Sequence, residues 1–107
     1  MKETLLEKIT SLLENKKAID MKTIDIKEKT TLADYFIIAS GTSSTHIKSL
    51  ADYVEVELKK ESIYPYKIEG RDSNSWILMD YEDVIVHLFT QEDREHYNLE
   101  DLWEQAR

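Results

Sequence analysis

The segment that most constrains the fold is an apolar run followed by a glycine turn and an amphipathic helix. Residues 35–39 are continuously apolar, which is typical of a strand covered on both faces of a sheet. The next residues, Ser40-Gly41-Thr42-Ser43-Ser44, carry small hydroxyl side chains that can cap a helix. Apolar residues then recur at helical spacing up to about residue 60, at Ile47, Leu50, Ala51, Val54 and Leu58. Together, strand, turn and helix predict half of a βαβ unit.

The other expected elements follow from hydrophobic periodicity and turn residues. Helical spacing predicts a helix over residues ~3–15, and short runs rich in β-branched or aromatic residues predict strands over 23–26, 66–69, 76–79 and 84–89. Pro65 makes 66–69 an edge strand, and residues 80–83 close a hairpin between the last two strands. A last helix is expected to begin at a cap on Asn98, with an apolar stripe at Leu99, Leu102, Trp103 and Ala106.

The resulting order, α-β-β-α-β-β-β-α, predicts one domain over residues 1–107: an α/β or α+β fold with a mixed sheet packed by helices. Within the second hairpin strand the side chains should alternate. Val84, Val86 and Leu88 are expected on one face of the sheet, and Ile85, His87 and Phe89 on the other.

Composition excludes several classes of protein. The 107 residues contain no cysteine, which rules out disulfides, thiol catalysis, iron–sulfur clusters and cysteine-based zinc sites. There are 22 acidic residues against 14 Lys and Arg, a net charge of −8, so a surface that coats nucleic acid is not expected and basic partners are favoured. Half of this charge, −4, lies in residues 92–107. No apolar run approaches the roughly 20 residues of a membrane span, and the first residues do not look like a leader, so we expect a cytoplasmic protein without a membrane contact.

Few residues suggest catalysis. The three histidines are scattered, so no metal site or cofactor is predicted. We expect His87 to be a hydrogen-bonded histidine on a sheet face and His46 to be exposed. The Ser40–Ser44 turn could present N–H groups to a phosphate, but it lacks the lysine of a P-loop, and helix capping explains it as well.

Aromatic and charged residues alternate in the last third of the chain. Trp76, Tyr81, Tyr97 and Trp103 are interleaved with Arg71, Asp80, Asp83, Arg94 and Glu100. Trp, Tyr and Arg are frequent in interface hot spots, although core packing explains Trp103 better.

Three stretches in order resemble the ribosomal silencing factor (RsfS, or Iojap) family over about residues 1–107. They are Ala-Asp-Tyr-Phe-Ile-Ile-Ala-Ser-Gly at 33–41, with Asp52 and Glu69-Gly70 after it; Trp-Ile-Leu-Met-Asp-Tyr-Glu-Asp-Val-Ile-Val-His-Leu-Phe at 76–89; and Arg-Glu-His-Tyr-Asn-Leu-Glu-Asp-Leu-Trp at 94–103. The chain departs from the family at Glu82, where the hairpin often carries a glycine, and at Glu61-Ser62, which replace a glycine frequent before the proline strand.

The resemblance implies a fold related to nucleotidyltransferases and a binding protein that is not an enzyme. Such a protein docks on the large ribosomal subunit through its basic protein L-fourteen, blocks joining of the small subunit and so represses translation, with little contact to rRNA. We place the contact surface at Trp76, Asp80, Tyr81, Asp83, Arg94 and Tyr97. The alternatives are a nucleotidyltransferase-type enzyme that uses the Ser40–Ser44 turn, and a self-associating domain that forms a homodimer.

Overall fold

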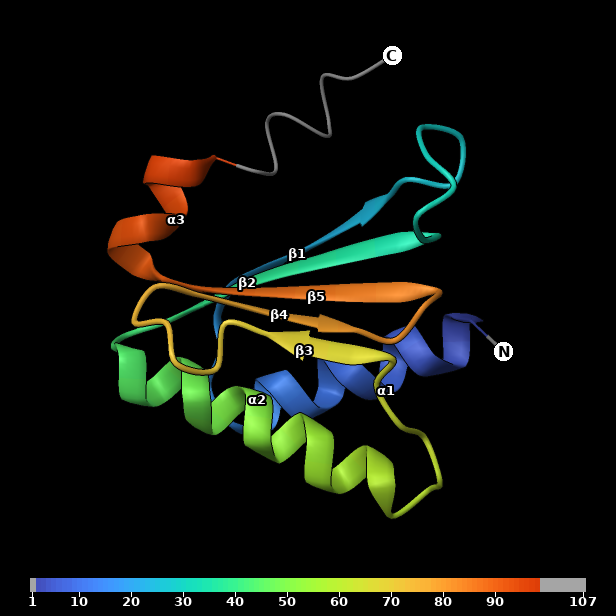
Figure 1. The fold of residues 1–107 in the computed structure, drawn as a ribbon, viewed down its shortest axis with the longest axis horizontal. Helices are drawn as coiled ribbons and strands as arrows, with labels where there is room; N and C mark the ends of the chain where they lie inside the picture. Colours follow the sequence, from blue (N-terminus) through green and yellow to red (C-terminus); the bar gives the residue numbers. More distant parts are fainter. Residues whose placement is uncertain (1, 99–107) are drawn as a thin grey trace.

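The chain folds around a five-stranded mixed sheet (Figure 1). The computed structural model describes residues 2–98. In chain order the elements are α1 Lys2–Asn15, β1 Ile19–Asp25, β2 Tyr35–Gly41, α2 Ser44–Lys59, β3 Lys67–Glu69, β4 Trp76–Asp80, β5 Val84–Thr90 and α3 Gln91–Tyr97. The strand order is β1-β2-β5-β4-β3, which makes β3 an edge strand as predicted. The family resemblance and the structure thus agree on an α/β fold.

The central strands β2 and β5 pair in parallel, and every other pair is antiparallel. Tyr35 is the partner of Val84 at the amino ends of the parallel pair, and Gly41 is the partner of Thr90 at the carboxyl ends. In the hairpin β4–β5, Trp76 lies beside Phe89, whereas the last residue of β4 lies beside Ile85. The two ends of β4 are therefore at opposite ends of the sheet.

Helices α1 and α2 cover one face of the sheet, and α3 lies on the other side (Figure 1). The helix-side core contains Val84, Val86 and Leu88 of β5, together with the whole predicted apolar stripe of α2. The opposite cluster contains Ile85 and Phe89, so the predicted alternation along β5 is confirmed. The five stripe residues of α2 are fully buried, and burial of each large aliphatic side chain stabilises the fold by roughly 1.5–3 kcal/mol.

The end of the described chain differs from the sequence-based expectation. A short helix, α3, follows β5 directly, and Thr90 caps it by accepting a hydrogen bond from Asp93 N–H. Asn98 has φ 50° and ψ 44° and ends α3 as its C-cap. The prediction of Asn98 as an N-cap is wrong, because an N-cap residue needs an extended backbone. The helix predicted after it lies outside the described residues.

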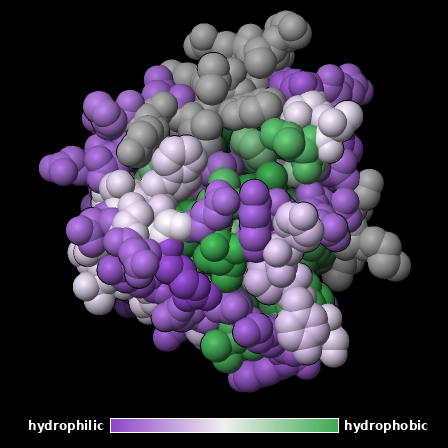
Figure 2. All heavy atoms as spheres, in the orientation of Figure 1, coloured by the Kyte–Doolittle hydropathy of each residue, from purple (hydrophilic) through white to green (hydrophobic). Residues whose placement is uncertain are grey.

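Polar side chains cover much of the outer surface. Figure 2, in the orientation of Figure 1, shows hydrophilic residues over much of this side, with hydrophobic side chains visible between them. Among residues 2–98, no helix combines the length and the apolar character that a bilayer span requires.

Candidate functional site

The six residues predicted as a contact surface fall at three places in the fold. Trp76 begins β4, near α3 and the carboxyl ends of the parallel strands. Asp80 and Asp83 lie at the other end of the hairpin: Asp80 is the last residue of β4, and Asp83 is in the connection to β5. Four residues along a strand correspond to about 13 Å, so Trp76 and Asp80 belong to one long surface and not to one compact site.

Trp76 is half-buried on the sheet face that α1 and α2 leave uncovered. Its indole Nε1–H donates to His87 Nδ1 at 3.2 Å, and its ring lies 5.0 Å from that of Phe89. Beside it is a small hollow of about 230 Å³, lined by Glu69, Trp76 and Leu78. An aromatic ring with a fixed orientation next to a shallow apolar hollow is suited to contact a partner protein.

His87 is buried under Trp76 and is 4% exposed. Because Nδ1 accepts the indole hydrogen bond, the neutral ring carries its proton on Nε2, and this nitrogen has no hydrogen-bond partner within the described residues. Burial lowers the pKa of His87 to about 4. The imidazole is therefore neutral at physiological pH, and the prediction of a hydrogen-bonded histidine on a sheet face is confirmed.

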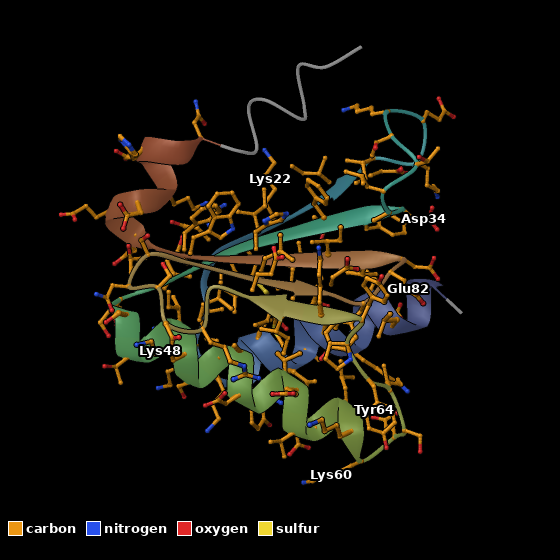
Figure 3. The ribbon with its side chains drawn as sticks, viewed as in Figure 1. Lys22, Asp34, Lys48, Lys60, Tyr64 and Glu82 are labelled. Carbon is orange, nitrogen blue, oxygen red and sulfur yellow. The ribbon has the colours of Figure 1, made fainter. Side chains whose placement is uncertain are left out.

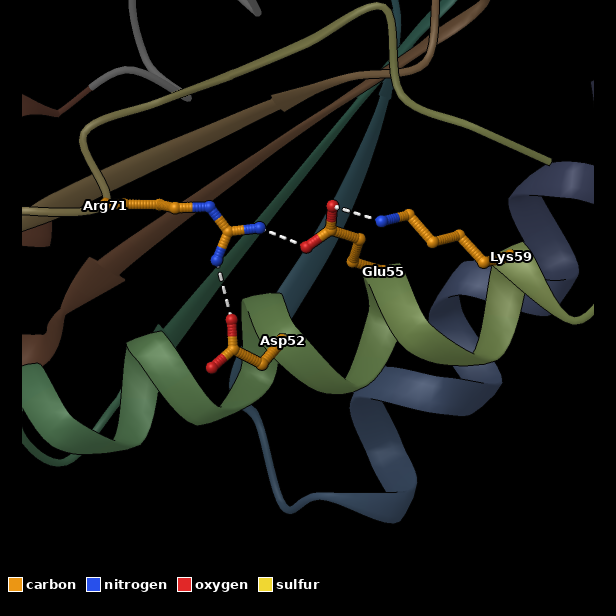
Figure 4. A network of polar contacts seen from close by, with 4 residues as sticks. All are labelled: Asp52, Glu55, Lys59 and Arg71. Atoms are coloured by element: carbon orange, nitrogen blue, oxygen red, sulfur yellow. Dashed lines mark hydrogen bonds and ion pairs between the residues drawn. The ribbon is translucent and has the colours of Figure 1, made fainter.

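The turn before Trp76 is fixed from two sides. Ser73 Oγ accepts hydrogen bonds from the N–H groups of Ser75, at 3.0 Å, and of Trp76, at 3.2 Å. Arg71 reaches across to α2, where its guanidinium donates to Asp52 at 2.6 Å and to Glu55 (Figure 4). Glu55 also pairs with Lys59 at 3.2 Å. This network attaches the loop that leads into Trp76 to the helix layer.

Tyr81 does not lie on the surface that the sequence suggested. Its side chain is 5% exposed and packs in the helix-side core, on the face of the sheet opposite Trp76. Burial, with a smaller effect of the Glu55 carboxylate, raises the pKa of Tyr81. The hydroxyl has no hydrogen-bond partner within the described residues. The expectation that Tyr81 supplies contact area to a partner is therefore corrected, because its ring stabilises the core.

Arg94 holds α3 against the sheet. Its guanidinium donates to Ser40 Oγ at 3.0 Å and to the carbonyl oxygen of Ile19 at 3.4 Å. The side chain is half-buried at the end of the sheet where β2 and β5 finish and where Trp76 begins β4. Arg94 therefore orders α3 at this end of the sheet. Tyr97 is the last residue of α3, and its side chain lies outside the described part of the structure.

The Ser40–Ser44 turn caps α2. Ser43 accepts a hydrogen bond from His46 N–H at 3.1 Å, and Thr42 N–H donates to His46 Nδ1 at 2.9 Å. His46 Nε2 bonds the carbonyl oxygen of Lys16 at 2.9 Å, so His46 is half-buried and not exposed as expected. Two of the N–H groups that a phosphate would need are already bonded. Within residues 2–98, moreover, no three carboxylates or histidines are close enough to hold a metal ion.

The acidic end of the hairpin meets the loop between β1 and β2. Asp83 carbonyl oxygen accepts hydrogen bonds from the N–H groups of Asp34, at 2.9 Å, and of Tyr35, at 3.1 Å. Asp80 carbonyl oxygen accepts from Tyr66 N–H at 2.7 Å. These contacts surround an open hollow of about 620 Å³, and two of its lining residues, Leu32 and Tyr66, are largely exposed. Sequence reasoning missed both, although the run Tyr64-Pro65-Tyr66 before an edge strand was an available signal.

Comparison with known families decides how this surface is interpreted. The family model described as "Ribosomal silencing factor during starvation" matches residues 1–107. The chain belongs to the ribosomal silencing factor family.

Members of the family from several bacteria are similar to the chain over most of its length. The ribosomal silencing factor of Zymomonas mobilis is 40% identical over 101 residues, which cover 94% of this chain and 76% of that protein. The factor of Bacillus subtilis is 33% identical and the match covers 97% and 88% of the two chains. A mouse protein named mitochondrial assembly of ribosomal large subunit protein 1 is 37% identical, over 92% of this chain and 44% of the mouse protein.

Solved structures support the fold of the family. A crystal structure of a Chromobacterium violaceum protein has a TM-score of 0.94 at 31% identity and covers 100% of this chain and 89% of that one. A Bacillus halodurans structure has a TM-score of 0.86 at 30% identity, with 94% of each chain covered.

The two departures from the family pattern both have left-handed backbones. Glu82, in the hairpin connection, has φ 70°, and Ser62, after α2, has φ 63°. Glycine adopts this region without a steric penalty, which explains why a glycine suits both positions. The same turn geometry can therefore occur in family members that have glycine at these positions and in this chain, which has Glu82 and Ser62.

Proposed function

We propose that this protein binds the large ribosomal subunit in the cytoplasm, through the basic ribosomal protein L-fourteen, and blocks joining of the small subunit. The observation that carries the proposal is the family match over residues 1–107. Occlusion of a subunit interface represses translation without any chemical step. This is consistent with a Ser40–Ser44 turn in which the Ser43 hydroxyl caps α2 and Thr42 N–H is bonded to the His46 ring.

The net charge of −8 supports a protein and not rRNA as the direct contact. Ribosomal RNA carries a phosphate on every nucleotide, so an acidic surface is repelled from it. A ribosomal protein rich in Lys and Arg offers the complementary charge, and complementary charge also accelerates association. Trp76 provides the aromatic contact area, and Asp80 and Asp83 provide the carboxylates. Arg94 orders α3 over β2 and β5, at the same end of the sheet as Trp76, and Tyr97 at the end of α3 completes the proposed contact residues.

The decisive experiment is a subunit-joining assay with purified bacterial subunits. Addition of the protein to separated subunits should decrease the peak of full ribosomes in a sucrose gradient, and Trp76→Ala should restore that peak. Tyr64→Ala is the matched control, because Tyr64 is an exposed aromatic residue that is not one of the proposed contact residues. An unchanged peak of full ribosomes with the wild-type protein would refute the proposed function.

A second candidate role is assembly of the large subunit, favoured by the name of the mouse relative. Both roles use the same docking surface, so they differ in when the protein binds. Accumulation of incomplete large subunits in cells that lack the protein would favour assembly. Normal subunits with excess joining in starved cells would favour silencing. Homodimerisation stays a separate prediction, which light scattering at micromolar concentration tests.

A further inference from the structure

A hollow of about 620 Å³ lies at the end of the sheet where β4 turns into β5. Its walls come from the β1–β2 loop, from the hairpin connection and from Tyr66 before β3. Figure 3 labels Asp34 and Glu82, which both line the hollow, at this end of the molecule. We refer to it below as the acidic groove.

Four carboxylates line the acidic groove against one ammonium group: Asp34, Asp80, Glu82 and Asp83 against Lys27. Hydrogen bonds from backbone N–H groups link them: Asp34 N–H donates to Asp83 carbonyl oxygen, and Glu82 N–H donates to the side-chain Oδ1 of Asp80 at 2.8 Å. The ammonium group of Lys27 donates to Tyr35 Oη at 3.1 Å and lies 3.6 Å from Asp25. Its charge is thus shared with a carboxylate outside the groove, and the groove as a whole is negative.

The groove also exposes apolar surface. Leu32 is 65% exposed and Tyr66 is 71% exposed, and both line it. Single exposed apolar residues are ordinary on a protein surface. Two large ones that converge on one concave, negatively charged surface form the combination that is typical of a contact with another polypeptide.

The chemistry of the groove selects its occupant. A bound metal ion does not fit, because within residues 2–98 no three candidate ligands converge on one point. Nucleic acid and a second copy of this acidic chain are both repelled. A polypeptide segment that carries Lys or Arg beside an apolar side chain can pair with the exposed side chains of Glu82 and Asp83 and cover Leu32 and Tyr66. Ribosomal proteins are rich in such segments, because they neutralise rRNA phosphates.

Resting on the function proposed above, we infer that the acidic groove binds a Lys- or Arg-containing segment of a large-subunit protein as a second contact, separate from Trp76. The two contacts lie at opposite ends of β4, about 13 Å apart. Joined on one rigid sheet, two modest contacts give a tighter complex than either alone.

The test compares groove variants with matched controls for binding to purified bacterial large subunits. The charge variant is Glu82→Gln with Asp83→Asn, and its control is Glu7→Gln with Asp72→Asn, which removes two exposed carboxylates elsewhere. The apolar variant is Leu32→Ser with Tyr66→Ser, and its control is Tyr64→Ser. We expect each groove variant to raise the Kd at least tenfold, and each control to change it less than twofold. The charge variant should also decrease the salt dependence of the Kd.

A photo-crosslinking amino acid in place of Tyr66 identifies the contacted molecule. The inference predicts a crosslink to a Lys- or Arg-containing segment of a ribosomal protein, and none from the same group at Tyr64. Equal Kd values for groove and control variants, or crosslinks from position 66 to rRNA, would overturn the groove inference while the proposed function stands. Wild-type protein that does not bind large subunits would refute the proposed function, and the groove inference with it. Thermal unfolding of every variant establishes that a raised Kd does not come from a lost fold.

Discussion

Replacement of Glu82 by glycine should stabilise the protein, and this prediction follows directly from the backbone of the hairpin. Glu82 has φ 70°, where a Cβ atom is too close to backbone atoms. That conformation costs an L-residue roughly 1–2 kcal/mol relative to its preferred regions. The side chain is exposed, and the hydrogen bond of this residue to Asp80 uses only its N–H group. Its removal therefore takes away strain without loss of packing.

The size of the gain depends on the unfolded chain as well. Glycine makes the unfolded state more flexible, which offsets about 0.4–1 kcal/mol of the relief. The net stabilisation should be about 0.5–1 kcal/mol, or a rise in Tm of roughly 3–6 °C for a domain of this size.

Glu82→Ala is the matched control. It removes the same charge from beside Asp80 and Asp83 but keeps the Cβ atom, so its Tm should stay within about 2 °C of the wild type. Thermal unfolding followed by circular dichroism measures all three proteins. A Tm of the glycine variant at or below that of the alanine variant would show that left-handed strain at Glu82 is absent.

Three further predictions concern the core, the turn at Gly70 and the dependence of stability on pH. Leu50→Ala should lower the free energy of unfolding by about 2–5 kcal/mol in urea titrations, because Leu50 is fully buried. Val56→Ala, on the exposed side of the same helix, should change this free energy by less than about 0.5 kcal/mol. Equal effects of the two substitutions would contradict the helix orientation. Gly70→Ala should lower the free energy of unfolding by about 3 kcal/mol or more, because φ is 85° and a Cβ atom would lie 2.3 Å from the carbonyl oxygen of Trp76. A variant as stable as the wild type in the same assay would show that this turn is not as tight as described. The buried neutral His87 has a pKa near 4 in the native state and about 6.5 when unfolded, so below pH 6.5 the unfolded state binds a proton that the native state does not. Stability should therefore fall by up to about 3 kcal/mol between pH 6.5 and 4, and His87→Gln should lose that part of the slope; an unchanged slope would mean that His87 does not titrate as described.

The sequence predicted the centre of the fold because several local signals agreed there. The apolar run predicts β2, and the Ser43 cap and the apolar stripe both predict α2; the buried residues of both elements agree with these signals. The short helix α3 was missed because Gln-Glu-Asp-Arg-Glu-His-Tyr has no apolar stripe. The helix is stabilised by the Thr90 cap and by the contact of Arg94 with Ser40. Hydrophobic periodicity does not reveal either contact.

The candidate site was predicted less well, for two physical reasons. Tyr81 was assigned to an exposed turn, yet it continues the alternation of Ile77 and Met79 toward the helix-side core, so the signal was present and overlooked. The acidic groove, in contrast, requires the parallel pairing that places Asp34 beside Asp83. Residues so far apart in the chain are brought together by sheet topology, which no local pattern contains.

The parallel pairing of β2 with β5 also bears on how the chain folds as it is made. Partner residues in these two strands are roughly fifty positions apart, and β5 is the middle strand of the sheet although it is the last strand in the sequence. A nascent chain that ends before residue 84 can form helices and the β1–β2 pair, but these have no central strand to join them to β4. Folding is thus expected to be slow and to finish only when almost the whole chain has been synthesised. Truncation before β5 should leave a polypeptide with an open apolar face, which is a target for chaperones and proteases.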